Sequence, residues 1–208
     1  WFQGLTPLLQ DLLLTHMTIR QLAAGQRLFA RGDAADGLYC VAEGAIKLTG
    51  SARDGKEAIL AIIEPPSWFG EIAAFDELTR THDAWADEPT TLLHIPAATL
   101  QHLLSEHPLL WHALGVLLSH KIRLAFLALE ELSLQPPASR LARRLLMMAR
   151  GYGELEGVSK REIRVPQEQL GQMLALSRQT VNQLLRQLEH SGVVRLGRGG
   201  IEILDLPQ

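Results

Sequence analysis

Near the C-terminus, apolar residues recur at the spacing of an α-helix in two successive segments. The first stripe consists of Leu170, Met173 and Leu174. This stripe follows Pro166 in the sequence, and proline is a residue type that fits the first turn of a helix. The second stripe consists of Val181, Leu184, Leu185 and Leu188. It begins behind Ser177, a residue type that caps free backbone N–H groups, and ends at Ser191-Gly192. The pattern predicts two helices joined by a tight turn.

Two short apolar runs follow the second predicted helix. They cover residues 193–196 and 201–204, and the turn between them reads Gly197-Arg198-Gly199-Gly200. Short runs around a glycine-rich turn are typical of a β-hairpin. Two helices and a hairpin in this order predict a winged helix-turn-helix.

From about Ile19 to Thr99 the pattern is different, because short apolar runs alternate with glycine or acidic turns. Turns this close together favour an antiparallel barrel or roll. The strands that the pattern predicts are Arg27–Ala30, Gly37–Glu43, Ala45–Ser51, Glu57–Ile63, Ala84–Asp87 and Thr91–Pro96. Before them, Leu5–Met17 reads as an amphipathic helix.

A long apolar helix is predicted between the roll and the winged domain. After a short helix at Ala97–Leu104, the segment from Pro108 to about Leu134 contains no further proline and has apolar residues on more than one face. One seam would hold Leu110, Leu114, Leu117, Leu124 and Ala128. Neighbouring faces would hold Val116, Ile122, Ala125, Phe126 and Leu129. Such a helix must bury one stripe against its own barrel and another against a partner, and a second copy of the chain is the simplest partner.

Gln135-Pro136-Pro137 ends the long helix, and Ser139–Arg150 then reads as a basic amphipathic helix. We therefore expect an α+β chain with an antiparallel β-roll over 1–106, a dimerisation helix over 107–135 and a winged helix-turn-helix over 136–208.

Composition agrees with a soluble chain of two modest domains, since 47% of the 208 residues are hydrophobic. No apolar run approaches the length of a membrane span, and no signal-peptide pattern leads the chain, so we expect a cytoplasmic protein that has no membrane partner. The single cysteine, Cys40, excludes an internal disulfide and a four-cysteine iron–sulfur cluster.

Charge is unevenly divided along the chain. Residues 1–137 hold 9 Lys and Arg against 16 Asp and Glu, whereas residues 138–208 hold 11 against 7. The basic part contains the predicted helix-turn-helix. A positive surface there would favour approach to phosphates.

The polar side of the second predicted helix carries candidate chemistry. Opposite its apolar stripe lie Arg178, Gln179, Asn182, Gln183 and Arg186. Guanidinium and amide groups can reach base edges in a major groove, so this face predicts DNA binding. Arginine and glutamine on a merely solvated helix face are the alternative, and the turn and hairpin around this helix favour DNA.

In this order and with these residues, the chain resembles the Crp/Fnr family of bacterial transcription regulators over nearly its whole length. In the C-terminal part the resemblance rests on Leu170-Gly171-Gln172, Leu176–Val181, Leu188-Glu189, Gly192 and the Gly197–Ile203 hairpin. In the roll it rests on Phe69–Phe75, which is similar to the cassette that surrounds phosphate and ribose in cyclic-nucleotide-binding relatives.

The resemblance implies a homodimer that reads a palindromic site in double-stranded DNA. Arg178, Gln179 and Gln183 would meet base edges, while Ser177 and Thr180 would lie near phosphates and Arg198 would reach a flanking phosphate. Gene activation would also require a surface for RNA polymerase. The operator, the target genes and the choice between activation and repression stay open.

For the roll the resemblance implies an effector site at Gly70, Glu71, Ile72 and Ala73. In the nucleotide-binding relatives a pair of residues faces the phosphate, and two pairs of this chain are candidates for that position. Arg80-Thr81 has the right composition, whereas His82-Asp83 occupies the matching position when the chain is counted back from Ala84-Trp85. On the long helix, Ala125-Phe126 stands where nucleotide-binding members offer hydroxyls. The effector is therefore a cyclic nucleotide or another small molecule, or the roll binds no effector and only stabilises the dimer.

Other functions find little support in the sequence. His102, His107 and His112 are spaced by five, which spreads them around a helix instead of forming a chelating face, so no metal or haem site is predicted. We find no lysine-type nucleotide loop, no nucleophile elbow and no supported pair of carboxylates, and therefore expect no enzyme. A cyclic-nucleotide-binding module without DNA function is the alternative from another class.

Overall fold

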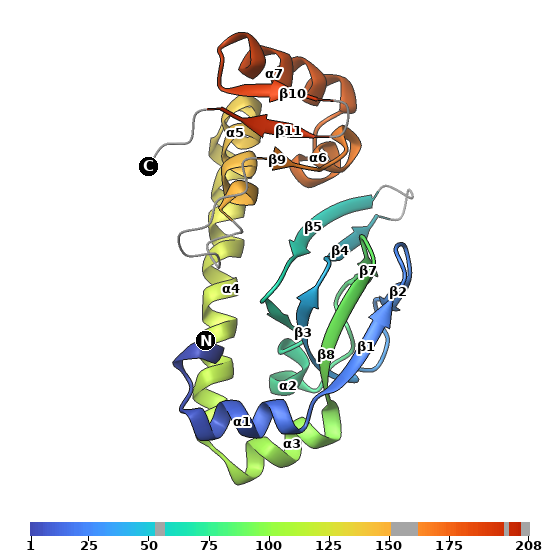
Figure 1. The fold of residues 1–208 in the computed structure, drawn as a ribbon, viewed down its shortest axis with the longest axis vertical. Coiled ribbons are helices and arrows are strands. Elements are labelled where there is room, and N and C mark those ends of the chain that lie inside the picture. Colours follow the sequence, from blue (N-terminus) through green and yellow to red (C-terminus); the bar gives the residue numbers. More distant parts are fainter. Residues whose placement is uncertain (53–56, 151–161, 198–199, 205–208) are drawn as a thin grey trace. The chain divides into compact units, whose positions relative to one another are not determined.

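The computed structural model describes residues 1–52, 57–150, 162–197 and 200–204 (Figure 1). In chain order, the elements up to the long helix are η1 Phe2–Gly4, α1 Pro7–Thr15, β1 Thr18–Leu22, β2 Arg27–Phe29, β3 Gly37–Glu43, β4 Ile46–Ser51, β5 Glu57–Ile63, β6 Trp68–Phe69, α2 Ile72–Asp76, β7 Asp83–Ala86, β8 Thr90–Pro96, α3 Ala97–Glu106 and α4 Leu109–Leu134. The later elements are α5 Pro137–Ala149, β9 Glu162–Ile163, α6 Gln167–Leu174, α7 Arg178–His190, β10 Val194–Leu196 and β11 Ile201–Ile203.

The strands of the N-terminal part form a roll of two antiparallel sheets. Within the described residues, one sheet has the order β1-β8-β3-β6 and the other the order β2-β7-β4-β5. The α+β fold and the β-roll that the sequence predicts are confirmed. The prediction missed β1, β6, α2 and η1, which are short or carry few apolar residues.

Strand β3 lies in the core of the roll and is apolar on both faces. Tyr39 and Val41 pack between the sheets with residues of β4, β7 and β8. Leu38 and Cys40 point to the other side, where they pack in a second cluster with residues of α1, α3 and α4. Because successive side chains in a strand point to opposite faces, a central strand covered on both sides needs a continuous apolar run.

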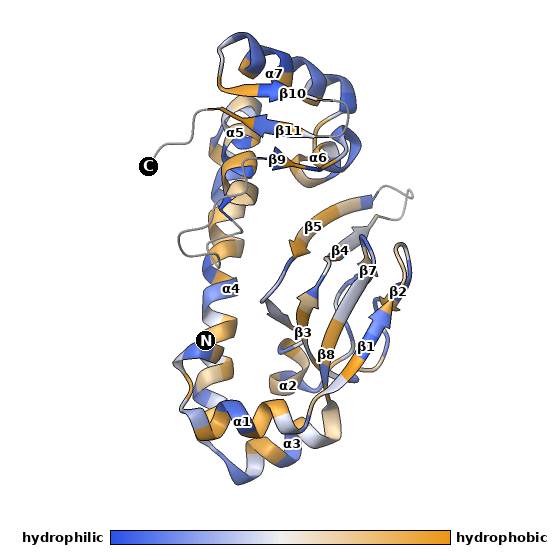
Figure 2. Cartoon of the chain, in the orientation of Figure 1, coloured by the Kyte–Doolittle hydropathy of each residue, from blue (hydrophilic) through white to orange (hydrophobic). Residues whose placement is uncertain are grey.

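The long helix α4 is buried only on one side of its first half. Leu110, Leu114 and Leu117 lie in the cluster that covers the roll. Farther along, apolar side chains are exposed, and orange residues continue along much of α4 in Figure 2. By length and composition this helix could cross a membrane, with 17% of the relevant window buried, which the sequence-based prediction did not anticipate.

The C-terminal part forms a second, separate core. Its described strands form a sheet of order β10-β11-β9, and α5, α6 and α7 bury Leu141, Leu145, Leu170, Val181 and Leu185. The turn between α6 and α7 requires glycine at position 171, since a Cβ atom there would lie 2.7 Å from the carbonyl oxygen of Leu176. The predicted helix-turn-helix and wing are therefore present.

The chain divides into two compact units, one of residues 1–50 and 60–127 and the other of residues 51–59 and 128–208. The divisions at 106 and 135 that the sequence predicts fall at the end of α3 and just after α4. The assignment of domains 1–106, 107–135 and 136–208 stays a prediction.

Candidate nucleic-acid interface and effector site

Helix α7 presents a polar face on a firmly anchored backbone. The Oγ atom of Ser177 accepts the N–H group of Thr180 at 3.0 Å and thereby caps the helix. On the inner side Val181 and Leu185 are fully buried. On the outer side Arg178, Gln179, Gln183 and Arg186 are exposed. These long donors are thus available to a ligand while the helix itself is fixed by its core.

Two of the predicted DNA-binding residues are half-buried as well as hydrogen-bonded within the protein. Thr180 is half-buried, and its hydroxyl lies 2.8 Å from that of Ser177. Asn182 is also half-buried and lies at the edge of the polar face, where its Nδ2 donates to the Oε1 atom of Gln167 on α6 at 3.0 Å. Its Oδ1 accepts the Nε–H group of Arg186 at 3.1 Å. Both hydrogen-bonding ends of the Asn182 amide therefore have partners.

The wing is tied to the end of α7. Glu189 accepts the backbone N–H group of Leu196 through Oε1 at 2.9 Å, and Arg195 pairs with Glu202 at 2.8 Å across β10 and β11. Arg198, which the sequence predicts at a flanking phosphate, lies outside the described residues.

In the roll, Gly70 lies between two polar groups. Its φ of 97° is a conformation that favours glycine, and a Cβ atom there would lie 2.7 Å from the carbonyl oxygen of Gly37 and 2.9 Å from Nη1 of Arg80. The backbone of the cassette therefore approaches a guanidinium closely. Glycine at this position permits that approach.

Arg80, rather than His82, is the side chain that lies against the cassette. Its Nη2 donates to Oδ1 of Asp36 at 2.7 Å and to the carbonyl oxygen of Gly37 at 2.9 Å, and its Nη1 donates to the carbonyl oxygen of Gly70 at 3.4 Å. The guanidinium lies 4.4 Å from the ring centroid of Phe29. Of the two registers left open by the sequence, the structure has Arg80 facing Gly70.

The buried guanidinium keeps one unsatisfied donor. Among the described residues, Nε of Arg80 is buried without a hydrogen-bond partner. A buried donor without an acceptor costs about 1–3 kcal/mol or more. An anionic oxygen is the acceptor that a guanidinium binds best.

Asp36 balances the positive charge at this site. It accepts from Arg80, from Arg20 at 3.1 Å and from the hydroxyl of Tyr39. Burial by itself would raise the pKa of Asp36, but the hydrogen bonds from Tyr39 and Arg80 outweigh it and the pKa is lowered. Burial and the contact with Asp36 raise the pKa of Tyr39. Two arginines around one carboxylate leave the cluster with a net positive charge, which suits an anionic ligand.

Glu71 is buried and paired with the long helix. Nζ of Lys121 on α4 donates to Oε2 of Glu71 at 2.7 Å. Ala73 is half-buried, Thr81 is exposed and pairs with Nδ1 of His82 at 2.9 Å, and burial lowers the pKa of His82. Ile72 is 44% exposed and Phe126 on α4 is 67% exposed. The structure thus gathers Gly70, Arg80 and Asp36 but leaves the predicted Phe126 in solvent.

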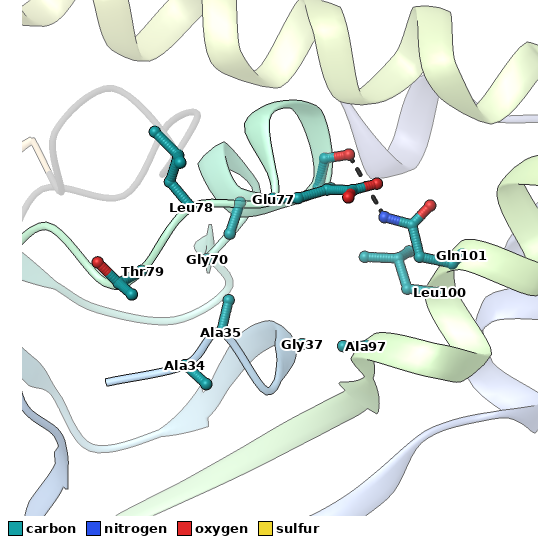
Figure 3. A pocket seen from close by; sticks show the side chains of 12 residues that line it. Ala34, Ala35, Gly37, Gly70, Glu77, Leu78, Thr79, Ala97, Leu100 and Gln101 are labelled. Atoms are coloured by element: carbon teal, nitrogen blue, oxygen red, sulfur yellow. Dashed lines mark hydrogen bonds between the residues drawn. The ribbon is translucent and has the colours of Figure 1, made fainter. Parts of the chain in front are cut away.

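A pocket of about 450 Å³ adjoins the cassette (Figure 3). Small and apolar side chains dominate its walls, which come from the loop before β3, from α2 and from the start of α3. Nε2 of Gln101 donates to the carbonyl oxygen of Ala74 at 3.5 Å across one wall. Gly70 and Gly37 line it as well, so the pocket reaches the loops that hold Arg80.

Sequence reasoning missed Asp36, Lys121 and Gln167. Asp36-Gly37 is one of the glycine and acidic turns that separate the apolar runs of the roll, and the signal for a further role is an acidic residue directly before a buried strand. Lys121 is the one lysine in the otherwise largely apolar helix α4, which also marks it. Within the described residues, no three His, Cys, Asp or Glu side chains come together as a metal-binding group.

A β-roll, a long helix and a capped recognition helix with a wing define the class of DNA-binding transcription regulators with a sensor domain. Residues 19–107 match the cyclic nucleotide-binding domain and residues 139–208 match the Crp-like helix-turn-helix domain. The cyclic AMP receptor protein of Thermus thermophilus is 35% identical over 97% of this chain and 91% of its own length. The chain therefore belongs to the Crp/Fnr family of transcription regulators.

Further relatives agree with this assignment. A CRP-like cAMP-activated global transcriptional regulator of Mycobacterium tuberculosis is 29% identical over 98% of this chain and 92% of its own length. The structure of FixK2 from Bradyrhizobium japonicum has a TM-score of 0.81 at 20% identity and covers 91% of this chain and 93% of that one, which supports the fold alone. These relatives are regulators of transcription or share their fold, and the DNA-binding function is favoured over a nucleotide-binding module without DNA function.

Proposed function

We propose that this protein is a cytoplasmic homodimer that reads a palindromic DNA site and responds to a phosphate-bearing effector in its β-roll. The observation that carries the DNA-binding part is the exposed face of α7, where Arg178, Gln179, Gln183 and Arg186 project from a helix that is anchored on its opposite side by two fully buried residues. Residues near the N-terminus of a recognition helix meet base edges, and hydroxyls beside it meet phosphates. Arg178 and Gln179 take the first role, and Ser177 takes the second.

The homodimer is proposed from α4. Along this helix Ile122, Phe126 and Leu129 follow each other at spacings of four and three, and their exposed fractions are 46%, 67% and 58%. An apolar stripe with this spacing is typical of a helix that packs against a second helix. A twofold pair of such helices fits the palindrome that two recognition helices read. A bilayer is the less favoured occupant, because His120, Lys121, Arg123 and Glu130 lie in the same stretch.

The effector is proposed to be an anion held near Gly70, Arg80 and Thr81. The unsatisfied Nε of Arg80, the net positive charge around Asp36 and the close approach that Gly70 permits all favour a phosphate group. A cyclic nucleotide fits this chemistry, and cyclic AMP is the first compound to test. Its ribose hydroxyl would compete with Lys121 for Glu71.

Selection of bound duplexes from a random pool tests the proposal. We expect the full-length protein, with and without cyclic AMP, to recover a palindrome whose half-site centres are separated by about one helical turn, ~34 Å. A variant with Arg178, Gln179 and Gln183 all replaced by Ala should recover no common sequence. If the duplexes that the parent recovers share no common sequence, sequence-specific binding is refuted.

A further inference from the structure

On the proposed reading face of α7, one residue already has a hydrogen-bond partner within the protein at each end of its amide. Asn182 is half-buried, its Nδ2 donates to Gln167 at 3.0 Å, and its Oδ1 accepts from Arg186 at 3.1 Å. These three side chains form a relay that runs from α6, through Asn182, to an exposed arginine on α7. We call the three side chains of Gln167, Asn182 and Arg186 the amide relay.

The direction of every hydrogen bond in the amide relay follows from the chemistry of arginine. A guanidinium nitrogen can only donate, so the Asn182 oxygen must face Arg186. The Asn182 nitrogen then faces α6, and Gln167 must present its oxygen to accept from it. The orientation of both amides is therefore fixed by one arginine, and reversal of either amide would set two donors or two acceptors against each other.

The relay holds Arg186 by one side of its guanidinium. Nε is the bound donor, and Arg186 lies four residues after Asn182, on the adjacent turn of the same helix face. The two terminal nitrogens carry the other four of its five N–H donors. Arg186 is exposed, so these donors are accessible to a ligand, while the hydrogen bond from Nε to Asn182 restricts the orientation of the guanidinium.

A fixed guanidinium plane matters most for a planar acceptor. Guanine presents O6 and N7 side by side in the major groove and accepts a bidentate pair from an arginine whose plane is aligned with the base. Gln179 and Gln183 lie three to seven residues from Arg186 on the same outward side, so Arg186 extends a base-reading row.

We propose that Asn182 is a positioning residue that fixes Arg186 for bidentate contact with a guanine in each half-site, and that Gln167 anchors it from α6. This inference rests on the proposed function, since it assumes that α7 reads a DNA site. It changes the role of Asn182 from a base-contacting residue to one that acts through Arg186. It also gives α6 a part in specificity that does not require contact with DNA.

The test measures discrimination between duplexes, not affinity alone. With the full-length protein and the selected palindrome, each half-site position is replaced in turn, and the ratio of Kd values is measured for the parent, R186A, N182A and the double variant, with and without cyclic AMP. R186A should lose about 5-fold or more of the discrimination at one guanine. N182A should lose most of the same discrimination at that position and none elsewhere. In the R186A background, N182A should have no further effect.

Asn182→Asp is the matched control. Aspartate keeps an oxygen for Nε of Arg186, so the discrimination at the guanine should be retained, although the added carboxylate should weaken binding to every duplex. Thermal unfolding of N182A separates a positioning role from a merely structural one. We expect its Tm to stay close to that of the parent.

Three results would overturn the relay. In the first, N182A keeps the parent's discrimination at every position. In the second, N182A and R186A weaken all duplexes equally and make the salt dependence shallower, as loss of a phosphate contact does. In the third, the two substitutions have additive effects. A parent that prefers no duplex would instead refute the proposed function, so the two failures are distinguishable.

Discussion

Arg178 is the first residue of α7 and lies beside the free N–H groups of that helix end. Its exposed guanidinium can form a bidentate pair with a guanine, which contributes about 1–3 kcal/mol of discrimination. We expect Arg178→Ala to remove most of the preference for the palindrome and to leave weak binding to any duplex that depends strongly on salt. Competition titrations with specific and random duplexes measure this. Arg164→Ala, which removes an equal charge from an exposed arginine paired with Glu162, should keep the preference.

His94 predicts a pH dependence of stability. It is 4% exposed, its ring stacks on Tyr39 with centroids 4.4 Å apart, and burial lowers its pKa below the ordinary value. A lowered pKa means that the folded state favours the neutral ring. Its stabilising contribution is therefore complete above about pH 6.5, the unfolded value, and is lost as the pH falls through the lower folded value.

The measurement is urea unfolding of the parent and of His94→Gln across this acidic range. Glutamine keeps a donor for the carbonyl oxygen of Asp36, which Nε2 of His94 contacts at 3.1 Å, but it does not titrate. We expect the free energy of unfolding of the parent to fall more steeply below about pH 6.5 than that of the variant. Parallel curves would contradict a buried neutral histidine.

Sequence patterns identify individual residues only where their role is local. Ser177 was predictable as a cap because capping depends on its own helix end. The partners of Asn182 and Arg80 depend on which side chain another element brings near, namely Gln167 from α6 and Asp36 from the loop before β3. Helical periodicity gives the face of Asn182 approximately, but it cannot show that Gln167 of a neighbouring helix accepts from its amide nitrogen while Arg186 of its own helix donates to its oxygen.

At the scale of elements, the proposed pairing of subunits rests on α4. Phe126 is the most exposed of the three residues in the apolar stripe, so Phe126→Glu places a charge where a second helix would bury it. An unpaired buried charge costs several kcal/mol, so we expect a monomer in sedimentation velocity experiments and a loss of palindrome binding. His120→Glu introduces the same charge at an exposed position outside the stripe and should remain a dimer. A dimeric Phe126→Glu protein would show that another surface pairs the subunits.

The sequence predicts long and strongly patterned elements better than short ones. The helices α4, α5 and α7 and the strands β3, β5 and β8 lie within a few residues of their predicted bounds. Strand β6 has two residues, and Ile19 in β1 is 70% exposed, so neither gives a clear apolar alternation. The register of β6 against β3, Tyr39 with Phe69 and Cys40 with Trp68, brings Gly70 near Gly37, and only the assembled sheet determines it.

At the scale of the whole molecule, effector binding should stabilise the folded protein. Cyclic AMP at a hundred times its Kd would add about 2.7 kcal/mol to the free energy of unfolding. Thermal unfolding with and without cyclic AMP measures this. Arg80→Lys keeps a charge but lacks the planar donor set, so it should fold yet respond much less. An equal response of both proteins would mean that Arg80 does not hold the phosphate.

Binding at two sites also obeys a strict reciprocity. A ligand shifts the DNA-binding equilibrium only by its differential affinity for the two states of the protein. If cyclic AMP tightens binding to the palindrome by some factor, the palindrome must tighten binding of cyclic AMP by the same factor. Titrating each ligand at saturating and at zero concentrations of the other measures both factors.

Lys121 offers a structural explanation for coupling between the effector site and DNA binding. Its ion pair with Glu71 joins the cassette to α4, the helix proposed to pair the subunits, so a ligand that displaces Lys121 alters a contact of that helix. We expect Lys121→Met, which keeps the length of the side chain without its charge, to reduce both coupling factors equally and to leave sequence preference at α7 unchanged. Unequal factors would reveal a linked process such as dimer dissociation. Unchanged factors would mean that the two sites communicate through other contacts.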